Sequence, residues 1–300
     1  MLEAVSVPAT LALVHFSSPP RPDLPSLDQF DHMLVYIPRP GGDSFLDCTA
    51  KNASLSAPWS LGLAGREALI LDAKNPHFVR LPEYPTNAST IRATRSVDLT
   101  NQTDALVREK LVFNGAHAGY VREYLRNQLP EGRRSYVASF LSDTIGQLLE
   151  LTFDGLDQPQ LPLAMQFTYL ARGQFHVLDG QIVGQPPAGF ERAFLIHEAV
   201  EKRSSPFEVT TPLTIEGSVT VNLPAGFKPR APGEPESKTG NAFVNSDAET
   251  HAAQHGWQLN YRLFEPAGRF AALEYASYCR AMQQAVETVQ PRLVGEPARP

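Results

Sequence analysis

One histidine and one aspartate, His32 and Asp47, flank a segment with the pattern of a β-hairpin. Residues 32–37 (HMLVYI) and 45–49 (FLDCT) are strand-like, and the Pro/Gly-rich residues 38–42 between them favour a turn. A histidine that is oriented by a carboxylate is a common general base in enzymes that activate a thiol or a hydroxyl. The pair therefore indicates nucleophilic catalysis, provided that the hairpin brings the two side chains together.

The register of this hairpin decides whether His32 and Asp47 share a face. If the turn is centred between Pro40 and Gly41, His32 lies opposite Thr49 and Asp47 lies two positions away on the same face. Diagonal neighbours of this kind have Cβ atoms up to roughly 7–8 Å apart, which a His–Asp hydrogen bond can span. A slip of one residue would place the two side chains on opposite faces.

The sequence does not show which residue would be the nucleophile that such a pair activates. The chain has two cysteines, Cys48 and Cys279, and none precedes His32. Cys48 follows Asp47 directly on a strand, so its side chain is predicted to point to the opposite face. Cys279 lies on a predicted helix, where we expect it to pack. Ser17 and Ser18 precede the histidine strand, and nothing in the sequence marks either as activated.

Other site chemistries have weaker signals. His15, His32 and Asp47 could meet as metal ligands on neighbouring strands, but metal sites usually show closer ligand spacing. The remaining histidines, His117 among them, are scattered and are expected at the surface or in the core. The glycines form no phosphate-binding loop. We therefore expect neither a metal nor a cofactor.

The elements around the pair are predicted from apolar periodicity. Strands are expected at 10–16, 67–71 and 77–81 in the same sheet as the hairpin. Helical spacing is seen up to Pro130, and again from Tyr136 to Leu149. From about residue 161 the period changes to two, as in antiparallel sheets with one buried face, until a final helix at 269–289.

Composition excludes several classes of function. The 300 residues carry a formal net charge of −6 and no basic run, so nucleic acid is not an expected partner. The longest apolar stretches are strand-sized, well short of the roughly 20 residues of a membrane helix. The first residues, MLEA, lack the basic start of a signal peptide. Localisation is therefore not readable from the chain itself.

The amino-acid sequence of the hairpin resembles the motifs of a known family. Residues 30–37 (FDHMLVYI) and 45–49 (FLDCT) are similar to the F-N-H-x-x-V-Y-V and W-L-D-P/C-T motifs of bacterial transglutaminase-like proteins. Residues 1–14, 25–30 and 69–71 resemble the family's segments around its histidine, and the order of elements from about residue 95 resembles its C-terminal region. The specific part of the match is confined to residues 25–50. Asp31 departs from it, since asparagine is common there.

The resemblance implies roles and an organisation for this chain. His32 matches the family's general base and Asp47 its orienting carboxylate, whereas the nucleophilic cysteine, expected on an upstream helix, has no counterpart. The implied fold is α+β, a truncated transglutaminase-like antiparallel sheet followed by a mostly β, sandwich-like domain with flanking helices. The expected divisions are the C-terminal half of a catalytic domain (1–90), a helical connecting segment (91–160), a β-sandwich-like domain with a terminal helix (161–290) and a disordered tail (291–300).

Three functions remain open at this point. The chain could be the C-terminal fragment of a transglutaminase-like protein, inactive alone because the cysteine is absent. It could instead be half of a split cysteine enzyme that is completed in trans, or a non-enzymatic β-sandwich module that binds a protein or glycan. We favour the first. Expected partners are thus the missing N-terminal catalytic segment or another protein, and family resemblance implies export to the periplasm or cell envelope.

The missing helix also leads to a physical expectation. Without it, the catalytic sheet should expose an apolar face around Leu11, Leu13, Leu34 and Tyr36. An exposed apolar patch of this size usually marks a binding surface or an aggregation hazard. We therefore expect the isolated chain to be marginally soluble or to pair through residues 1–80.

Overall fold

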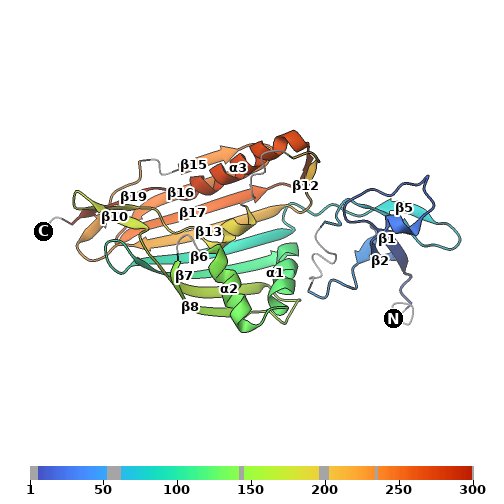
Figure 1. The fold of residues 1–300 in the computed structure, drawn as a ribbon, viewed down its shortest axis with the longest axis horizontal. Coiled ribbons are helices and arrows are strands. Elements are labelled where there is room, and N and C mark those ends of the chain that lie inside the picture. Colours follow the sequence, from blue (N-terminus) through green and yellow to red (C-terminus); the bar gives the residue numbers. More distant parts are fainter. Residues whose placement is uncertain (1–5, 53–61, 142–144, 196–202, 234–235, 299–300) are drawn as a thin grey trace.

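The computed structural model describes residues 6–52, 62–141, 145–195, 203–233 and 236–298. These residues form a small sheet near the N-terminus and a much larger sheet from the rest of the chain (Figure 1). The last strand of the small sheet ends at Arg80, and the first strand of the large sheet begins at Ser89. The two sheets therefore use separate stretches of the sequence.

Within the described residues, the small sheet has five antiparallel strands in the order β3-β2-β1-β4-β5. Alternate residues of these strands are buried on one face, because side chains on a strand point to opposite sides in turn. Leu34, Tyr36 and Phe45 are buried in this core. The strands are β1 (Thr10–Val14), β2 (His32–Ile37), β3 (Ser44–Leu46), β4 (Glu67–Ile70) and β5 (His77–Arg80).

The opposite face of the small sheet is apolar and half-exposed. Met33, Leu13, Leu69 and Phe78 are paired in turn across β2, β1, β4 and β5, so their side chains form one row. Met33 is 48% exposed and Phe78 37%. The expectation of an exposed apolar face is met by this row and by Leu11 beside it. It was wrong about Leu34 and Tyr36, which have the opposite parity and lie in the core.

In the part of the chain that the structure describes, the large sheet has eight strands in the order β15-β16-β17-β13-β6-β7-β9-β8. The pairing of β13 with β6 is parallel and the other pairings are antiparallel. The strands are β6 (Ser89–Leu99), β7 (Ala105–Gly115), β8 (Ile145–Asp154), β9 (Leu163–Ala171), β13 (Leu213–Asn222), β15 (Glu236–Gly240), β16 (Asn245–Ala253) and β17 (Gly256–Glu265).

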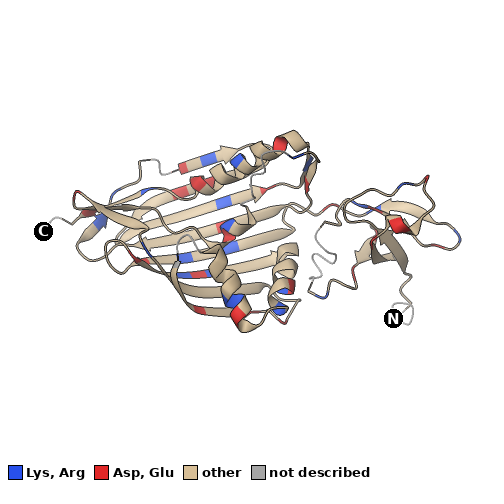
Figure 2. Cartoon of the chain, viewed as in Figure 1, with Lys and Arg blue, Asp and Glu red and all other residues tan. Residues whose placement is uncertain are grey.

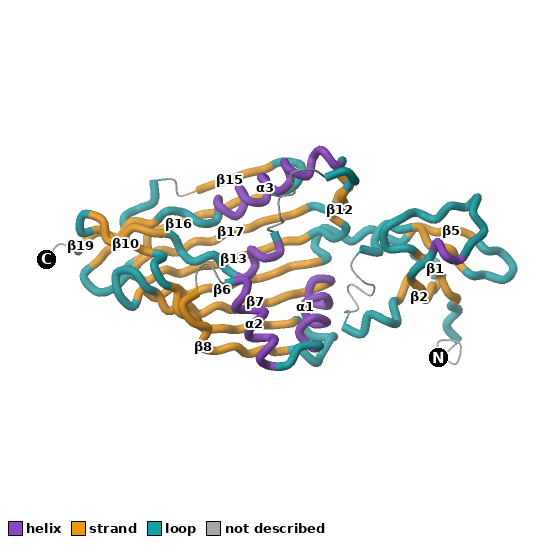
Figure 3. Tube along the Cα trace, viewed as in Figure 1, coloured by secondary structure: helices purple, strands orange, loops and turns teal. Residues whose placement is uncertain are grey.

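Three α-helices, counted over the described residues, lie against one face of the large sheet (Figure 3). They are α1 (Ala116–Arg126), α2 (Pro130–Phe140) and α3 (Tyr275–Thr288). Their apolar residues, such as Val121, Val137 and Met282, are buried in the same core as the sheet. Smaller pieces complete the covering layer: β10 (Phe175–Leu178), β11 (Gln181–Gly184), β19 (Leu293–Pro297), β14 (Phe227–Pro229), the pair β12 (Phe207–Val209) and β18 (Gly268–Phe270), and short 3₁₀ turns at Phe190–Phe194 and Ala272–Glu274. A further 3₁₀ turn, Leu27–Gln29, lies between β1 and β2 of the small unit.

A charged cluster is buried beneath this layer. The Arg95 guanidinium donates to Glu109 at 2.8 Å and to Glu191 at 2.7 Å, and Tyr261 Oη donates to Glu191. Burial raises the pKa of Glu109 to about 7. The cluster stays in the core because each carboxylate contacts the same guanidinium.

The α+β, mostly β fold class is confirmed, whereas several local expectations were wrong. Residues 91–160 contain the long strands β6, β7 and β8 as well as two helices, so they are not a helical connecting segment. The helix expected from Tyr136 to Leu149 ends at Phe140, and residues from Ile145 onward belong to β8. Within the expected disordered tail, Leu293–Pro297 forms β19, which pairs with β11 and β14.

The distribution of charged residues and the length of the helices bear on the partners that this protein could have. Basic and acidic residues are interleaved over both sheets, and neither sign gathers in one region of the view (Figure 2). No helix among the described residues is long and apolar enough to cross a membrane.

Candidate functional site

The hairpin of β2 and β3 has the register that the sequence predicts. Tyr36 lies opposite Phe45, which corresponds to a turn centred between residues 40 and 41. His32, at the start of β2, and Asp47, directly after β3, consequently share a face. His32 Nε2 lies 2.9 Å from Asp47 Oδ2. The structure therefore brings together the two residues that were selected from the sequence, while their catalytic role stays a prediction.

Asp47 is held by its neighbours as well as by His32. Its Oδ1 accepts hydrogen bonds from the Thr49 backbone N–H at 2.9 Å, the Thr49 hydroxyl at 2.6 Å and the Ala50 backbone N–H at 3.3 Å. This is the local turn that aspartate commonly stabilises. The side chain of Asp47 is fully buried and that of His32 is 15% exposed. Oδ2 is thus directed at the imidazole by donors that occupy Oδ1.

The contact assigns the two ring nitrogens of His32. An ionised carboxylate only accepts hydrogen bonds, so the nitrogen that faces Asp47 must carry the proton in the neutral ring. Nε2 is then the donor and Nδ1 has the free lone pair. Nδ1 is the atom that could take a proton from a nucleophile.

A second set of contacts fixes the imidazole from the side. The Phe16 ring packs on the His32 ring with centroids 5.0 Å apart and planes tilted by 55°. The Phe16 backbone N–H donates to Asp31 Oδ1 at 3.1 Å. Gly62 lies beside the Phe16 ring, since a Cβ at this position would be 3.5 Å from it, and its φ of +94° is one that favours glycine. Asp31, the departure from the family motif, thus holds the residue that packs against His32.

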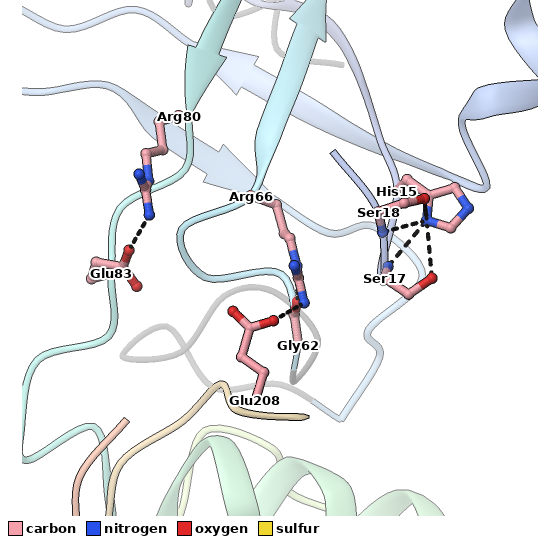
Figure 4. Close-up of polar contacts among 8 residues, drawn as sticks. All are labelled: His15, Ser17, Ser18, Gly62, Arg66, Arg80, Glu83 and Glu208. Carbon is pink, nitrogen blue, oxygen red and sulfur yellow. Dashed lines mark hydrogen bonds and ion pairs between the residues drawn. The ribbon is translucent and has the colours of Figure 1, made fainter. Parts of the chain in front are cut away.

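His15, Ser18 and Asp31 have the residue types of a catalytic triad but not its chemistry. His15 Nε2 lies 3.5 Å from Asp31 Oδ2, and its Nδ1 lies 3.1 Å from the Ser18 hydroxyl. However, the same Nδ1 accepts the backbone N–H groups of Ser17 and Ser18 at 3.0 and 3.1 Å (Figure 4). A ring nitrogen has one lone pair, which these amides already engage. His15 therefore stabilises a turn and is not a free base.

The loop after Asp47 is docked on α1. Asn52 is 7% exposed. Its backbone carbonyl accepts from Arg122 Nη1 at 3.2 Å, its Oδ1 accepts from Arg126 Nη1 at 2.8 Å, and its amide donates to Glu123. One helix of the large unit thereby holds the loop that positions Asp47. Sequence reasoning missed this link, because a residue pair so distant in the chain has no local pattern.

The two units also meet at an ion pair and a cleft. Arg66 Nη2 donates to Glu208 Oε2 at 2.7 Å, while Arg66 Nε donates to the Gly62 carbonyl at 3.1 Å (Figure 4). A cavity of about 560 Å³ lies beside this pair, and Pro19 and Arg269 are among its lining residues. The cleft is bordered by both units and by the loop that leads from His15.

The cysteines of the chain do not complete the site. Cys48 is exposed and lies in the turn after β3, so its expected place on a strand was wrong, and its thiol makes no hydrogen bond to His32. Cys279 is buried in α3, as expected. Of the proposed metal ligands, His32 contacts Asp47 and His15 contacts Asp31. The described residues contain no group of three or more metal-ligating side chains.

No family model matches the chain, and no curated protein sequence matches it. Its structure resembles a crystal structure from Parabacteroides distasonis described as that of a "putative protease", with a TM-score of 0.49 and 14% sequence identity. The similarity covers 98% of this chain and 41% of that chain, so the chain spans less than half the length of that protein. At this TM-score and identity, the similarity carries no information about chemistry.

Proposed function

We propose that His32 and Asp47 are the general base and the orienting carboxylate of a Cys-His-Asp acyl-transfer site. The observation that carries this proposal is the 2.9 Å contact between His32 Nε2 and a carboxylate oxygen whose partner oxygen is held by three donors. A buried, oriented pair of this kind supports base catalysis, because the carboxylate fixes the tautomer and stabilises the imidazolium.

The chemistry would follow from the free Nδ1 of His32. A thiol beside it transfers its proton to Nδ1, and the resulting thiolate attacks an amide carbonyl. Collapse of the tetrahedral intermediate breaks the C–N bond, and the imidazolium returns the proton to the departing amine. The thioester is then resolved by water, which gives hydrolysis, or by a second amine, which gives cross-linking.

The thiol in this proposal comes from a polypeptide other than residues 1–300. Cys48 lies in an exposed turn after β3 and makes no hydrogen bond to His32, and Cys279 is buried in α3. Residues 1–300 alone would then show no thiol-dependent activity. The donor could be covalently joined to this chain or separate from it, and the proposal has the same catalytic roles in either case.

The test uses the protein purified from its source with every polypeptide that accompanies residues 1–300. Ammonia release from a glutamine peptide, incorporation of a primary amine and cleavage of a labelled protein are measured with and without iodoacetamide. The proposal predicts an iodoacetamide-sensitive activity in one of these assays. His32→Ala should reduce it by roughly 10²–10⁴-fold, the usual contribution of a general base.

His251→Ala is the matched control, because His251 lies on β16 and its side chain is 59% exposed. This variant should retain the activity of the wild type. An iodoacetamide-sensitive activity that His32→Ala leaves intact would contradict the assignment of the base.

A second candidate function is that of a non-enzymatic interaction module. The observation that favours it is the half-exposed apolar row of Met33, Leu13, Leu69 and Phe78 across the small sheet. Apolar surface of this kind commonly marks a protein–protein contact. A partner whose affinity is unchanged by His32→Ala but lost on Met33→Lys would favour this function over catalysis.

A further inference from the structure

A cavity of about 350 Å³ lies at the end of the large sheet, within the size range of small-ligand sites. It is bordered by α1, β12, the last residue of β17 and the start of α3. In Figure 1, β12 and α1 lie at the end of the large sheet that faces the small unit. This cavity does not include His32 or Asp47, so an argument about it does not depend on the proposed acyl-transfer chemistry.

Three buried polar groups line the cavity, and each can accept a hydrogen bond. Glu265 is 6% exposed, and its Oε1 accepts from Tyr278 Oη at 2.6 Å. Among the described residues, no cation contributes to the pKa of Glu265, and neither His117 Nδ1 nor Thr211 Oγ1 has a hydrogen-bond partner. Buried polar atoms are rarely left unpaired in proteins, so their convergence on one cavity indicates a bound donor.

The other wall of the cavity is aromatic. The rings of Phe207, Tyr275 and Tyr278 contact one another, with centroids 5.0 to 6.1 Å apart. The guanidinium of Arg203, an exposed residue at the rim, lies 4.8 Å from the Tyr275 centroid and 5.5 Å from that of Phe207. The aromatic wall therefore already attracts a cation from within the chain.

The charges around the cavity favour a cation and disfavour an anion. Burial lowers the pKa of His117 to about 4, so its imidazole is neutral at pH 7. Burial also raises the pKa of Glu265 to about 7, and the hydrogen bond from Tyr278 opposes this rise only in part. Glu208 lines the same cavity and is neutralised by Arg66. A bound ammonium group would give the ionised Glu265 carboxylate a positively charged partner.

We propose that this cavity binds a protonated primary alkylamine, with the ammonium group at Glu265 and Thr211 and the alkyl chain against Phe207, Tyr275 and Tyr278. Such an amine could be a lysine side chain of a protein or a small free amine. Both present the same chemistry to the cavity. Arg203 acts as an internal competitor, since its guanidinium covers part of the same aromatic wall.

The full chain is titrated at pH 8 with n-butylamine, with N-acetyl-lysine methylamide and with n-butanol, the neutral analogue. Binding is followed by saturation-transfer difference NMR and by the side-chain carboxyl ¹³C shift of Glu265. We expect an amine to bind with a dissociation constant on the order of 1 mM, as for a ligand with few atoms, and n-butanol to bind at least tenfold more weakly. Binding of n-butylamine alone assigns the site to free amines. Binding of the lysine derivative alone assigns it to protein side chains, and binding of both assigns it to the shared ammonium.

Variants separate this site from general amine binding. Glu265→Gln should weaken amine binding at least tenfold, and Arg203→Gln should strengthen it because the competing cation is removed. Glu249→Gln, on the exposed side of β16, is the control and should bind as the wild type does. The carboxyl ¹³C shift of Glu265 is measured on the wild-type protein, so this readout does not depend on whether a variant folds. Equal binding of n-butanol, or an amine that leaves the Glu265 carboxyl shift unchanged, would overturn the proposal.

Discussion

Asp47 divides its two carboxylate oxygens between His32 and the loop that follows it. Oδ2 lies 2.9 Å from His32 Nε2, and Oδ1 accepts from the Thr49 amide and hydroxyl and from the Ala50 amide. The three donors to Oδ1 thus help to hold the carboxylate in the orientation that directs Oδ2 at the histidine. This division of the two oxygens also predicts what an isosteric amide would do at the same position.

Asp47→Asn should reverse the tautomer of His32. The Asn carbonyl oxygen must face the donors of Thr49 and Ala50, so its NH₂ group faces Nε2, which then accepts. The proton moves to Nδ1, and the free lone pair of the proposed base is lost. Side-chain ¹⁵N shifts of labelled histidine should show protonated Nε2 in the wild type and protonated Nδ1 in the variant. The same tautomer in both proteins would contradict this reading of the contact.

Asn52→Ala should loosen the loop that carries Asp47. The substitution removes the side-chain hydrogen bonds to Glu123 and Arg126, which costs about 0.5–1.5 kcal/mol because both partners are exposed and can bind water instead. Hydrogen exchange of the amides of residues 49–52 should become faster. Asn260→Ala, at an exposed position of β17, should leave exchange there unchanged. If exchange in this loop is the same in both variants, the docking contact does not hold the loop.

Arg95→Met should be strongly destabilising, whereas Arg92→Met on the same strand should not. Removing Arg95 leaves Glu109 and Glu191 buried without a cation, which costs about 3–5 kcal/mol. Arg92 and Glu216 form an exposed pair whose loss costs under about 1 kcal/mol. Urea unfolding at pH 8 measures both. Equal effects of the two substitutions would contradict the importance of the buried cluster.

Glu265 should make stability fall as the pH rises. Its pKa is about 7 in the folded chain against an ordinary value of 4.5, so the folded state binds the proton more tightly. The stabilisation is fully present below about pH 4.5 and is lost as the pH rises through 7. At about 1.4 kcal/mol per pKa unit, the loss is about 3.5 kcal/mol. Glu265→Gln should remove this part of the pH dependence in unfolding experiments between pH 5 and 8; a slope equal to that of the wild type would contradict it.

The apolar row on the small sheet should bind a hydrophobic dye. Met33 is 48% exposed and lies within a continuous apolar row, whereas Leu273 is 92% exposed and lies in a short 3₁₀ turn of the large unit. Met33→Lys should therefore reduce fluorescence of bound anilinonaphthalene sulfonate several-fold, and Leu273→Lys should leave it unchanged. A wild-type chain that binds no dye would show that this face is covered in solution.

The small sheet was largely predictable because its signals are local. The Pro/Gly turn sets the register of β2 and β3, and that register places His32 and Asp47 on one face. Side chains alternate along β2, so Leu34 and Met33 point to opposite faces of the sheet. Which of these faces is buried depends on the loops that pack against it. Sequence reasoning therefore identified an exposed apolar face and assigned it two residues of the wrong parity.

The large unit was less predictable because the apolar pattern of one element runs into that of the next, so the sequence does not show clearly where an element ends. The stripe from Tyr136 continued through Leu149 in helical spacing, although Ser142, Asp143 and Thr144 form a polar triplet that can mark a turn. β19 is a short strand whose partners, β11 and β14, are far away in sequence. The cavity at His117 and Glu265 was not predictable at all, because its lining comes from five separate elements and the loops between them.

The central claim is that His32 activates a cysteine from outside residues 1–300, and the pH dependence of cysteine alkylation tests it most directly. The protein from its source, with the polypeptides that accompany it, is treated with iodoacetamide from pH 5 to 9, and each modified cysteine is quantified by mass spectrometry. The account predicts one cysteine other than Cys48 and Cys279 that reacts at pH 6. In His32→Ala its midpoint should move to about 8.5, the ordinary pKa of a thiol. A protein whose cysteines are Cys48 and Cys279 alone, or a third cysteine whose reactivity is the same in His32→Ala, would contradict it.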